Sequence, residues 1–273
     1  MTNKPIGVFD SGLGGLTAVK ELIKVLPNED IIYFGDTGRV PYGNRSQRTI
    51  IKYANDDIAF LNSLDVKMII VACGTVSSVI NKLGNKLTIP FTGVIEPTAK
   101  AAINSTSNGR IGIIGTTATI KSGSYQNELQ KLNSNVQIFE QDCPLFVPLV
   151  ENGFIQKNNK AAILIAQEYL KNIKKANVDT LILGCTHYPI ISEIICSVIG
   201  KNVHLIDPGK ETANSACNML KGLNLKTTKT SLGSHSFYVS DDVYGFSKNA
   251  GLFLGKDLNE KVNLVNIEAY CST

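Results

Sequence analysis

The stretch IGVFDS at residues 6–11 decides the fold, because a second stretch of the same character, IGIIGT, occupies residues 111–116. Each is a short apolar run that closes on small or polar residues, as buried strands of parallel sheets do. Similar runs alternate along the chain with longer segments, which is the order of βα units. The sequence therefore predicts an α/β fold with parallel sheets flanked by helices. The other predicted strands are IIYFG (31–35), MIIVA (68–72), FTGVI (91–95), VQIF (136–139), TLILG (180–184) and VHLI (203–206).

The segment between the first two predicted strands has helical spacing. Its apolar residues recur mostly at intervals of three or four, which places them on one face of a helix. Pro27 follows and cannot continue a helix. We therefore expect a helix over residues 13–26, with Leu16, Val19, Leu22, Ile23 and Leu26 on its buried face.

Three further pairs of residues follow the two opening stretches in the same order. Asp36 pairs with Asp142, Cys73 with Cys185, and VIEP (94–97) with LIDP (205–208), each 106 to 112 residues apart. A shared order at a nearly constant separation indicates duplication. We therefore predict two pseudo-symmetric α/β domains with an active site in the cleft between them.

The residues after Asp207 belong to neither copy of the pattern. We expect a helix over 210–220, a strand over 236–240, another helix and a closing strand. This tail is predicted to return and complete the first domain. The domains are then residues 1–96 with 208–273, and residues 97–207.

Composition favours a small-molecule enzyme. The chain has 273 residues, 43% of them hydrophobic and 18% charged, with a net charge of +4. No basic run is interleaved with aromatic residues, so nucleic acid is not an expected partner. We see no signal peptide and no apolar stretch that would span a bilayer, so we expect a cytoplasmic protein without a membrane partner, whose cysteines are reduced.

Cys73 and Cys185 each come directly after a predicted strand and before a predicted helix start. In open parallel sheets, ligands bind at the carboxyl ends of the strands. A helix N-terminus there lowers the pKa of a thiol and binds carboxylates. A free cysteine is more often a small buried hydrophobe, but two at equivalent positions favour function. The other four, of which only Cys143 lies near a strand end, fit the structural interpretation: Cys143, Cys196, Cys217 and Cys271.

Paired thiols suit one kind of chemistry. Duplicated domains that face each other present two strand ends to one cleft. Inverting an amino acid at its α-carbon requires a base on one face and an acid on the other. A thiolate and a thiol placed opposite each other meet that requirement and exchange roles when the reaction reverses.

Asp10 and Ser11 bring a carboxylate and a hydroxyl to the same cleft. The alternative interpretation of Ser11 is a helix N-cap. The glycines that follow resemble a dinucleotide loop, but the third glycine of that motif is missing and Asp10 would repel a pyrophosphate. The hypothesis of a nicotinamide-dependent dehydrogenase is supported by this loop alone. We interpret the site as an amino-acid site.

Tyr42 and Gly43 lie in a long connection after the second strand and are candidate substrate contacts, or simply parts of a turn. His187 follows Cys185 closely, and we favour a role in poising that thiol over capping the next helix. Glu151 reads as a solvated turn residue from the sequence alone. His204 and His235 are predicted to be structural.

Together these segments resemble the bacterial glutamate racemases of the aspartate/glutamate racemase superfamily. The similarity covers almost the whole chain and is carried by IGVFDSGLGG (6–15), YFGDTGRVPYGNR (33–45), VACGTVS (71–77), GVIEP (93–97) and GCTHYP (184–189).

The resemblance implies a homodimeric, cofactor-independent and metal-free isomerase. It implies that Cys73 acts on D-glutamate and Cys185 on L-glutamate. It also implies that the protein supplies D-glutamate for peptidoglycan, and so serves cell wall biogenesis and cell shape. By the same resemblance, Asp10, His187 and Glu151 assist the thiols. The substrate is then held by Asp10, Ser11, Tyr42, Gly43, Gly74, Thr75, Thr186 and His187.

One position departs from the family pattern, which usually has Asn after the first cysteine where this chain has Gly74. A side-chain contact is therefore missing, and backbone N–H groups at Gly74 and Thr75 remain to hold the substrate. The alternatives are an aspartate racemase-like enzyme with the same mechanism, and a non-catalytic amino-acid-binding protein.

Overall fold

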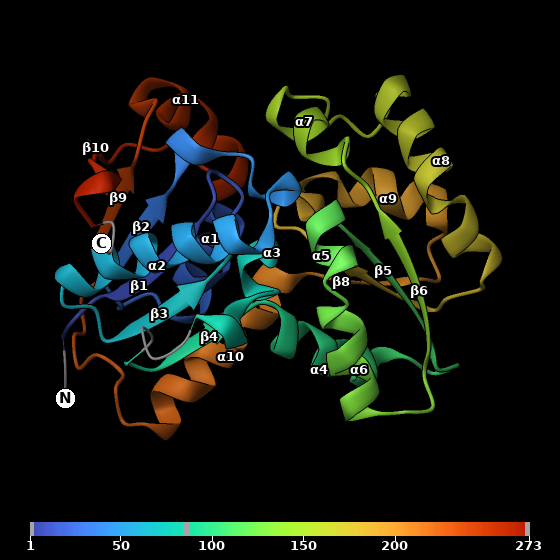
Figure 1. The fold of residues 1–273 in the computed structure, drawn as a ribbon, viewed down its shortest axis with the longest axis horizontal. Coiled ribbons are helices and arrows are strands. Elements are labelled where there is room, and N and C mark those ends of the chain that lie inside the picture. Colours follow the sequence, from blue (N-terminus) through green and yellow to red (C-terminus); the bar gives the residue numbers. More distant parts are fainter. Residues whose placement is uncertain (1–2, 84–87, 271–273) are drawn as a thin grey trace.

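The computed structural model describes residues 3–83 and 88–270, and has two halves side by side, each a parallel sheet covered by helices (Figure 1). The predicted α/β fold is confirmed. The central strand β1 (Ile6–Asp10) is buried along its whole length, because helices cover both faces of its sheet. Such a strand has to be apolar throughout, which is why IGVF stands out in the sequence.

The first sheet has six strands in the order β10-β9-β2-β1-β3-β4. The C-terminal segment supplies two of them, since β9 pairs with β2 and β10 with β9. The strands besides β1 are β2 (Ile31–Gly35), β3 (Met68–Val71), β4 (Phe91–Gly93), β9 (His235–Val239) and β10 (Val262–Leu264).

The second sheet has four strands in the order β6-β5-β7-β8, and this repeats the order β2-β1-β3-β4 of the first. The two chain ends of the described structure lie in the first half (Figure 1). The strands of the second sheet are β5 (Arg110–Gly115), β6 (Gln137–Asp142), β7 (Thr180–Leu183) and β8 (His204–Ile206).

Strand register corrects the pairing of Asp36 with Asp142. Gly35 lies opposite Asp10 in the first sheet, whereas Asp142 lies opposite Gly115 in the second. Asp36 therefore corresponds to Cys143. The backbone agrees, because the N–H groups of these two residues donate to the equivalent carbonyls of Asp10 and Gly115.

The pairing of VIEP with LIDP is also wrong. Thr92 lies opposite Ile70 in the first sheet, and Ile206 lies opposite Ile182 in the second, so Gly93 is the equivalent of Asp207. The predicted strand over 91–95 also ends early, at Gly93. Val94 donates its N–H to the Ser77 hydroxyl at 3.1 Å and its neighbour begins a helix. Pairing within the sheet, rather than a constant separation, defines the repeat.

The first predicted helix begins three residues later than expected. It starts at Leu16, because residues 12–15 form a turn in which the Gly12 N–H donates to the Asp10 carboxylate at 2.9 Å. The helices are α1 (Leu16–Val25), α2 (Gln47–Ser63), α3 (Gly74–Ser77), α4 (Ile95–Ser105), α5 (Thr117–Lys121), α6 (Ser124–Leu132), α7 (Phe146–Glu151), α8 (Lys160–Lys175), α9 (Ser192–Ile199), α10 (Pro208–Gly222) and α11 (Val243–Leu254). Short 3₁₀ turns are η1 (Thr37–Arg39), η2 (Tyr42–Asn44), η3 (Ile80–Lys82), η5 (Tyr188–Ile191) and η6 (Ile267–Tyr270).

One apolar core runs through both halves. It contains Leu16 and Leu22 from α1, Leu220 from α10, and Phe146 and Leu170 from the second half. Two smaller cores lie on the outer faces, one beneath α2 and one between α4, α6 and the second sheet. The shared core holds the facing strand ends together.

The domain limits of 1–96 with 208–273 and 97–207 stay a proposal, with the first limit falling in the opening turn of α4. In the described part of the chain, no helix is long and apolar enough to cross a membrane.

Candidate active site

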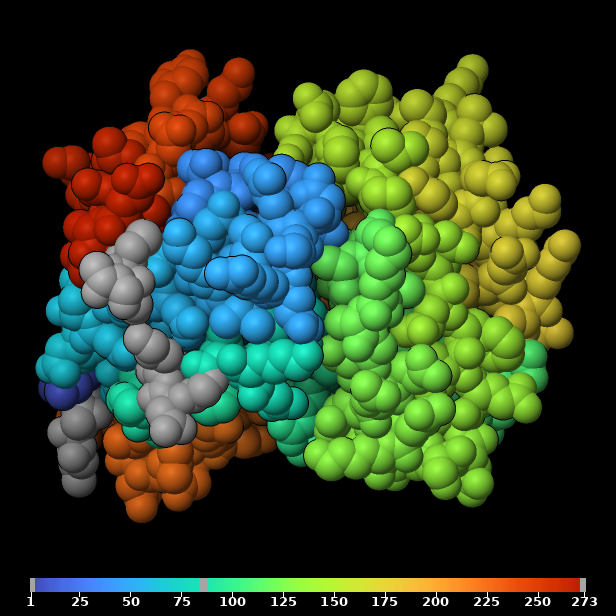
Figure 2. Space-filling model, viewed as in Figure 1, coloured from blue at the N-terminus to red at the C-terminus, as the bar shows by residue number. Residues whose placement is uncertain are grey.

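A cavity of about 380 Å³ lies where the strand ends of the two sheets face each other. In Figure 2 the blue N-terminal part of the chain meets the green middle part along the boundary between the halves. Every site residue predicted from the sequence lines this cavity. They are Asp10, Ser11, Tyr42, Gly43, Cys73, Gly74, Thr75, Glu151, Cys185, Thr186 and His187.

Cys73 follows β3 and is 5% exposed. Its thiol donates to the Ser11 hydroxyl, which lies 3.7 Å away. Ser11 is not the N-cap of α1, because that helix begins at Leu16 and its N-cap is Gly15. Burial and the nearby Asp10 carboxylate raise the pKa of the Cys73 thiol to about 12, against the opposing effect of the Val76 N–H and Ser11. This thiol is held protonated at rest.

Cys185 follows β7 and has a different neighbour. Its sulfur lies 3.8 Å from Nδ1 of His187, and Nε2 of the same ring lies 2.9 Å from Glu151 Oε1. Burial lowers the pKa of His187, but Cys185 and Glu151 outweigh it and raise that pKa to about 10. Phe253 of α11 packs edge-on against the ring at 5.2 Å. His187 therefore carries its positive charge beside the Cys185 sulfur.

Asp10 is 1% exposed and lies on the Cys73 side of the cavity. Burial raises the pKa of its carboxyl, while His187 and the N–H groups of Gly12 and Gly15 lower it. The first thiol thus faces a carboxyl and the second an imidazole. The two strand ends match in backbone but differ in charge.

Helix N-termini contribute less here than the sequence indicated. The helix after Cys73 has only four residues, and its favourable N–H contact does not offset the burial of the thiol. After Cys185 the chain forms the 3₁₀ turn η5, and α9 begins only at Ser192. His187 makes no side-chain cap and points to Cys185 instead.

Two glycines bring the halves together beside the thiols. A Cβ on Gly14 would lie 2.2 Å from the Thr186 hydroxyl and 2.6 Å from Nδ1 of His187. A Cβ on Gly74 would lie 2.6 Å from the Gly184 carbonyl oxygen. Side chains of the second half therefore lie against the glycine loop of the first, and a side chain at position 74 would require the Gly184 backbone to shift.

Several lining residues were not predicted from the sequence. Thr116 could have been found, because it ends the stretch that repeats IGVFDS. Its hydroxyl lies 3.1 Å from that of Thr75 and also accepts the N–H of Thr119 as the cap of α5. The others carried no signal of their own: Gly12, Leu13, Val40, Pro41, Asn44, Thr117, Pro144, Val147, Pro148, Asn152 and Gly184.

The remaining cysteines and histidines of the described chain lie elsewhere. Cys143 is buried and its thiol is 3.8 Å from the Gln141 carbonyl, while Cys196 and Cys217 lie in α9 and α10. His204 and His235 begin β8 and β9. Cys271 falls outside the described residues. Within residues 3–83 and 88–270, no group of three or more His, Cys, Asp or Glu side chains is arranged to hold a metal ion.

Comparison with known proteins agrees with this geometry. The profile of the Asp/Glu/hydantoin racemase family matches residues 16–216. A glutamate racemase of Geobacter metallireducens is 45% identical over 97% of this chain and 98% of its own. The chain belongs to the glutamate racemase family. Another family member, from Persephonella marina, is 44% identical over 96% of this chain and 98% of its own.

Solved structures of the glutamate racemase family have the same fold. The Francisella tularensis enzyme in complex with D-glutamate superimposes with a TM-score of 0.91 at 39% identity, covering 98% of this chain and 99% of that one. The Bacillus anthracis isoform RacE1 gives a TM-score of 0.91 at 35% identity, covering 96% and 97%.

Proposed function

We propose that this protein interconverts L- and D-glutamate without a cofactor, using Cys73 and Cys185 as the acid/base pair. The observation that carries the proposal is the placing of two thiols at equivalent strand ends on one cavity. Its close relatives are glutamate racemases, and one of them is described in complex with D-glutamate.

In the proposed reaction, the Cys185 thiolate removes the α-proton of L-glutamate, and the Cys73 thiol donates a proton to the opposite face. The C–H bond breaks toward one sulfur and a new C–H bond forms from the other, which gives D-glutamate and leaves Cys73 as the thiolate. The reverse reaction begins from that state. Imidazolium at His187 supports the first thiolate, and Glu151 supports the imidazolium.

Asp10, on the other side, is the proposed partner of Cys73. The substrate is proposed to be held by Ser11, Tyr42, Gly43, Gly74, Thr75 and Thr186, together with Asp10 and His187. Since Gly74 has no side chain, its contribution is its backbone N–H.

The test follows the loss of circular dichroism with L-glutamate and, in parallel, with L-aspartate. Deuterium should enter the α-carbon of glutamate in deuterated water, at a rate that does not change on adding pyridoxal phosphate. Cys73→Ala and Cys185→Ala should each lose racemisation by at least about 1,000-fold while keeping the fold. Full turnover by either variant would falsify the two-thiol reaction, and glutamate binding without exchange would indicate a binding protein.

We also propose that the protein is cytoplasmic, supplies D-glutamate for peptidoglycan and forms a homodimer. The assembly is checked by sedimentation velocity at micromolar concentration. A single species of monomer mass at every concentration would contradict the dimer.

A further inference from the structure

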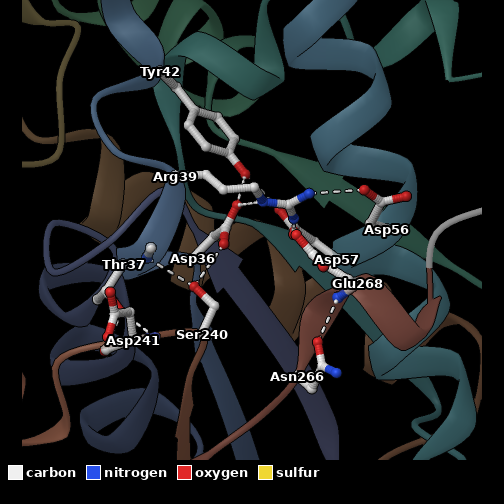
Figure 3. A network of polar contacts seen from close by, with 11 residues as sticks. Asp36, Thr37, Arg39, Tyr42, Asp56, Asp57, Ser240, Asp241, Asn266 and Glu268 are labelled. Atoms are coloured by element: carbon white, nitrogen blue, oxygen red, sulfur yellow. Dashed lines mark hydrogen bonds and ion pairs between the residues drawn. The ribbon is translucent and has the colours of Figure 1, made fainter.

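The wall of the cavity at residues 40–44 rests on a buried ionic cluster (Figure 3). The cluster consists of Asp36 after β2, Arg39 of η1, Tyr42 of η2 and Asp57 of α2, and we call it the Tyr42 cluster. Nε of Arg39 lies 2.6 Å from Asp36 Oδ2, and one of its terminal nitrogens lies 3.0 Å from Asp57 Oδ1. The side chains of both aspartates have no exposed surface. The cluster therefore links the sheet, α2 and the cavity wall.

The hydroxyl of Tyr42, a residue that lines the cavity, points into this cluster. Its hydroxyl donates to Asp36 and lies 3.2 Å from Asp57 Oδ2 (Figure 3). Burial and the neighbouring carboxylates raise the pKa of Tyr42 well above its ordinary value, so the hydroxyl keeps its proton. Burial and Asp36 raise the pKa of Asp57 as well, against the opposing effect of Arg39. The hydroxyl is thus committed to the two aspartates.

The turn that carries Tyr42 also has free backbone groups. Tyr42 and Gly43 are the first residues of the 3₁₀ turn η2, which leaves their N–H groups without an acceptor inside the turn, and both residues line the cavity. A Cβ on Gly43 would lie 3.1 Å from Thr116, so this turn also touches the second half. Free N–H groups in a substrate cavity are suited to a carboxylate.

We propose that Asp57 is a positioning residue, which fixes the Tyr42 side chain so that the N–H groups of Tyr42 and Gly43 face the substrate carboxylate. The proposal rests on the proposed racemase function for its kinetic readout. Asp57 itself lies beneath the wall and is not among the residues that line the cavity. Anchoring the side chain below the turn sets the position of the backbone above it.

A double-mutant cycle tests the assignment. Asp57→Ala and Tyr42→Phe should each raise the KM for glutamate about tenfold with little change in kcat, because a binding contact is lost equally in ground and transition states. The double variant should be no worse than Tyr42→Phe, since Tyr42→Phe already removes the hydroxyl on which Asp57 acts. Multiplying effects, or an unchanged KM, would overturn the proposal.

Two further variants separate positioning from simple destabilisation. Asp57→Asn keeps a hydrogen-bonding side chain of the same shape and should bring KM back to within about threefold of the original value. A KM that stays high in Asp57→Asn counts against the assignment. Tyr53→Phe is the matched control, because the Tyr53 ring packs against Tyr42 at 5.3 Å but its hydroxyl is not part of the cluster. It should leave KM unchanged.

A readout without substrate keeps this proposal distinct from the proposed function. In hydrogen–deuterium exchange, the amide of Arg45, which donates to the Tyr42 carbonyl at 3.0 Å, should exchange faster in Asp57→Ala than in Tyr53→Phe, with the rest of the first sheet unchanged. Equal exchange in both variants would overturn the positioning role even if the protein racemises glutamate. Faster exchange in a protein that does not racemise glutamate would contradict only the function.

Discussion

At the scale of single residues, the two thiols differ more in their surroundings than in their own positions. Cys73 faces Asp10, and its pKa is raised to about 12, whereas Cys185 faces His187, which Glu151 holds in its charged form. Under the proposed reaction, the charge near each sulfur determines which one starts as the base. The proposed effect of Glu151 on Cys185 passes through His187, which lies 2.9 Å from its carboxylate.

Glu151→Gln should lower the pKa of His187, because the charge that helps to raise it is removed. The imidazolium is present below its raised pKa and lost as the pH rises through it. The alkaline limb of kcat/KM for L-glutamate should therefore move to lower pH, with about a tenfold loss at pH 9.

Rates measured from pH 6 to 10 in both reaction directions check this. Glu193→Gln, an exposed acid in the first turn of α9, serves as the control. A profile of Glu151→Gln that overlays the control would show that Glu151 does not hold the charge on His187.

At the scale of elements, local sequence predicted strand cores well and their ends poorly. The tail strand expected at 236–240 is β9, His235–Val239, and the helix expected at 210–220 is extended to Pro208–Gly222 by the Asp207 cap. Ends depend on partners distant in sequence, such as Ser77 at Val94, which no local pattern reveals. Local sequence also does not reveal which loops are held in place by hydrogen bonds to a single carboxylate.

Asp179 is such a carboxylate, in the turn before β7. It accepts hydrogen bonds from Thr106, from Ser107 and from the N–H of Asn108, and these lower its pKa although burial raises it. A lowered pKa means that the stabilisation is present at neutral pH and is lost as the pH falls through the lowered value.

Asp179→Asn should therefore lower the free energy of unfolding by about 1 kcal/mol at pH 7, a value reduced by solvent screening. The difference should begin to shrink below about pH 4, where the Asp179 carboxyl of the unfolded chain takes up a proton while that of the folded protein stays charged. Urea unfolding at pH 7 and pH 3 measures it. Asp257→Asn, at an exposed position, should be neutral at both, and an equal deficit of Asp179→Asn at both pH values would contradict the assignment.

At the scale of the whole molecule, the repeat in the sequence was sufficient to predict that the strand ends face each other. All the predicted site residues lie on one cavity, including Glu151, which was predicted from the family resemblance and not from the repeat. It could not supply residues such as Val147 and Phe253, because their approach to the site depends on how separate elements pack. Close packing of the halves depends on glycines.

Gly14→Ala tests that packing. The added methyl would meet Thr186 and His187, so these side chains should shift and kcat/KM should fall by about 100-fold while the protein stays folded. Gly222→Ala is the matched control, since a Cβ at Gly222 meets no atom within 4 Å. Unchanged activity in Gly14→Ala would show that the halves separate freely at this contact.

The unequal charges beside the thiols have a kinetic consequence. Under the proposed reaction, each turnover leaves the free enzyme in the opposite protonation state from the one in which it began. The two states differ in free energy, because one places negative charge beside an imidazolium and the other beside a carboxyl. The enzyme can regain its starting protonation state in two ways, by running the reaction backwards on bound glutamate or by exchanging a proton with solvent. At high substrate concentration these two routes compete. The return of the proton, which involves no bound glutamate, then becomes part of the catalytic cycle.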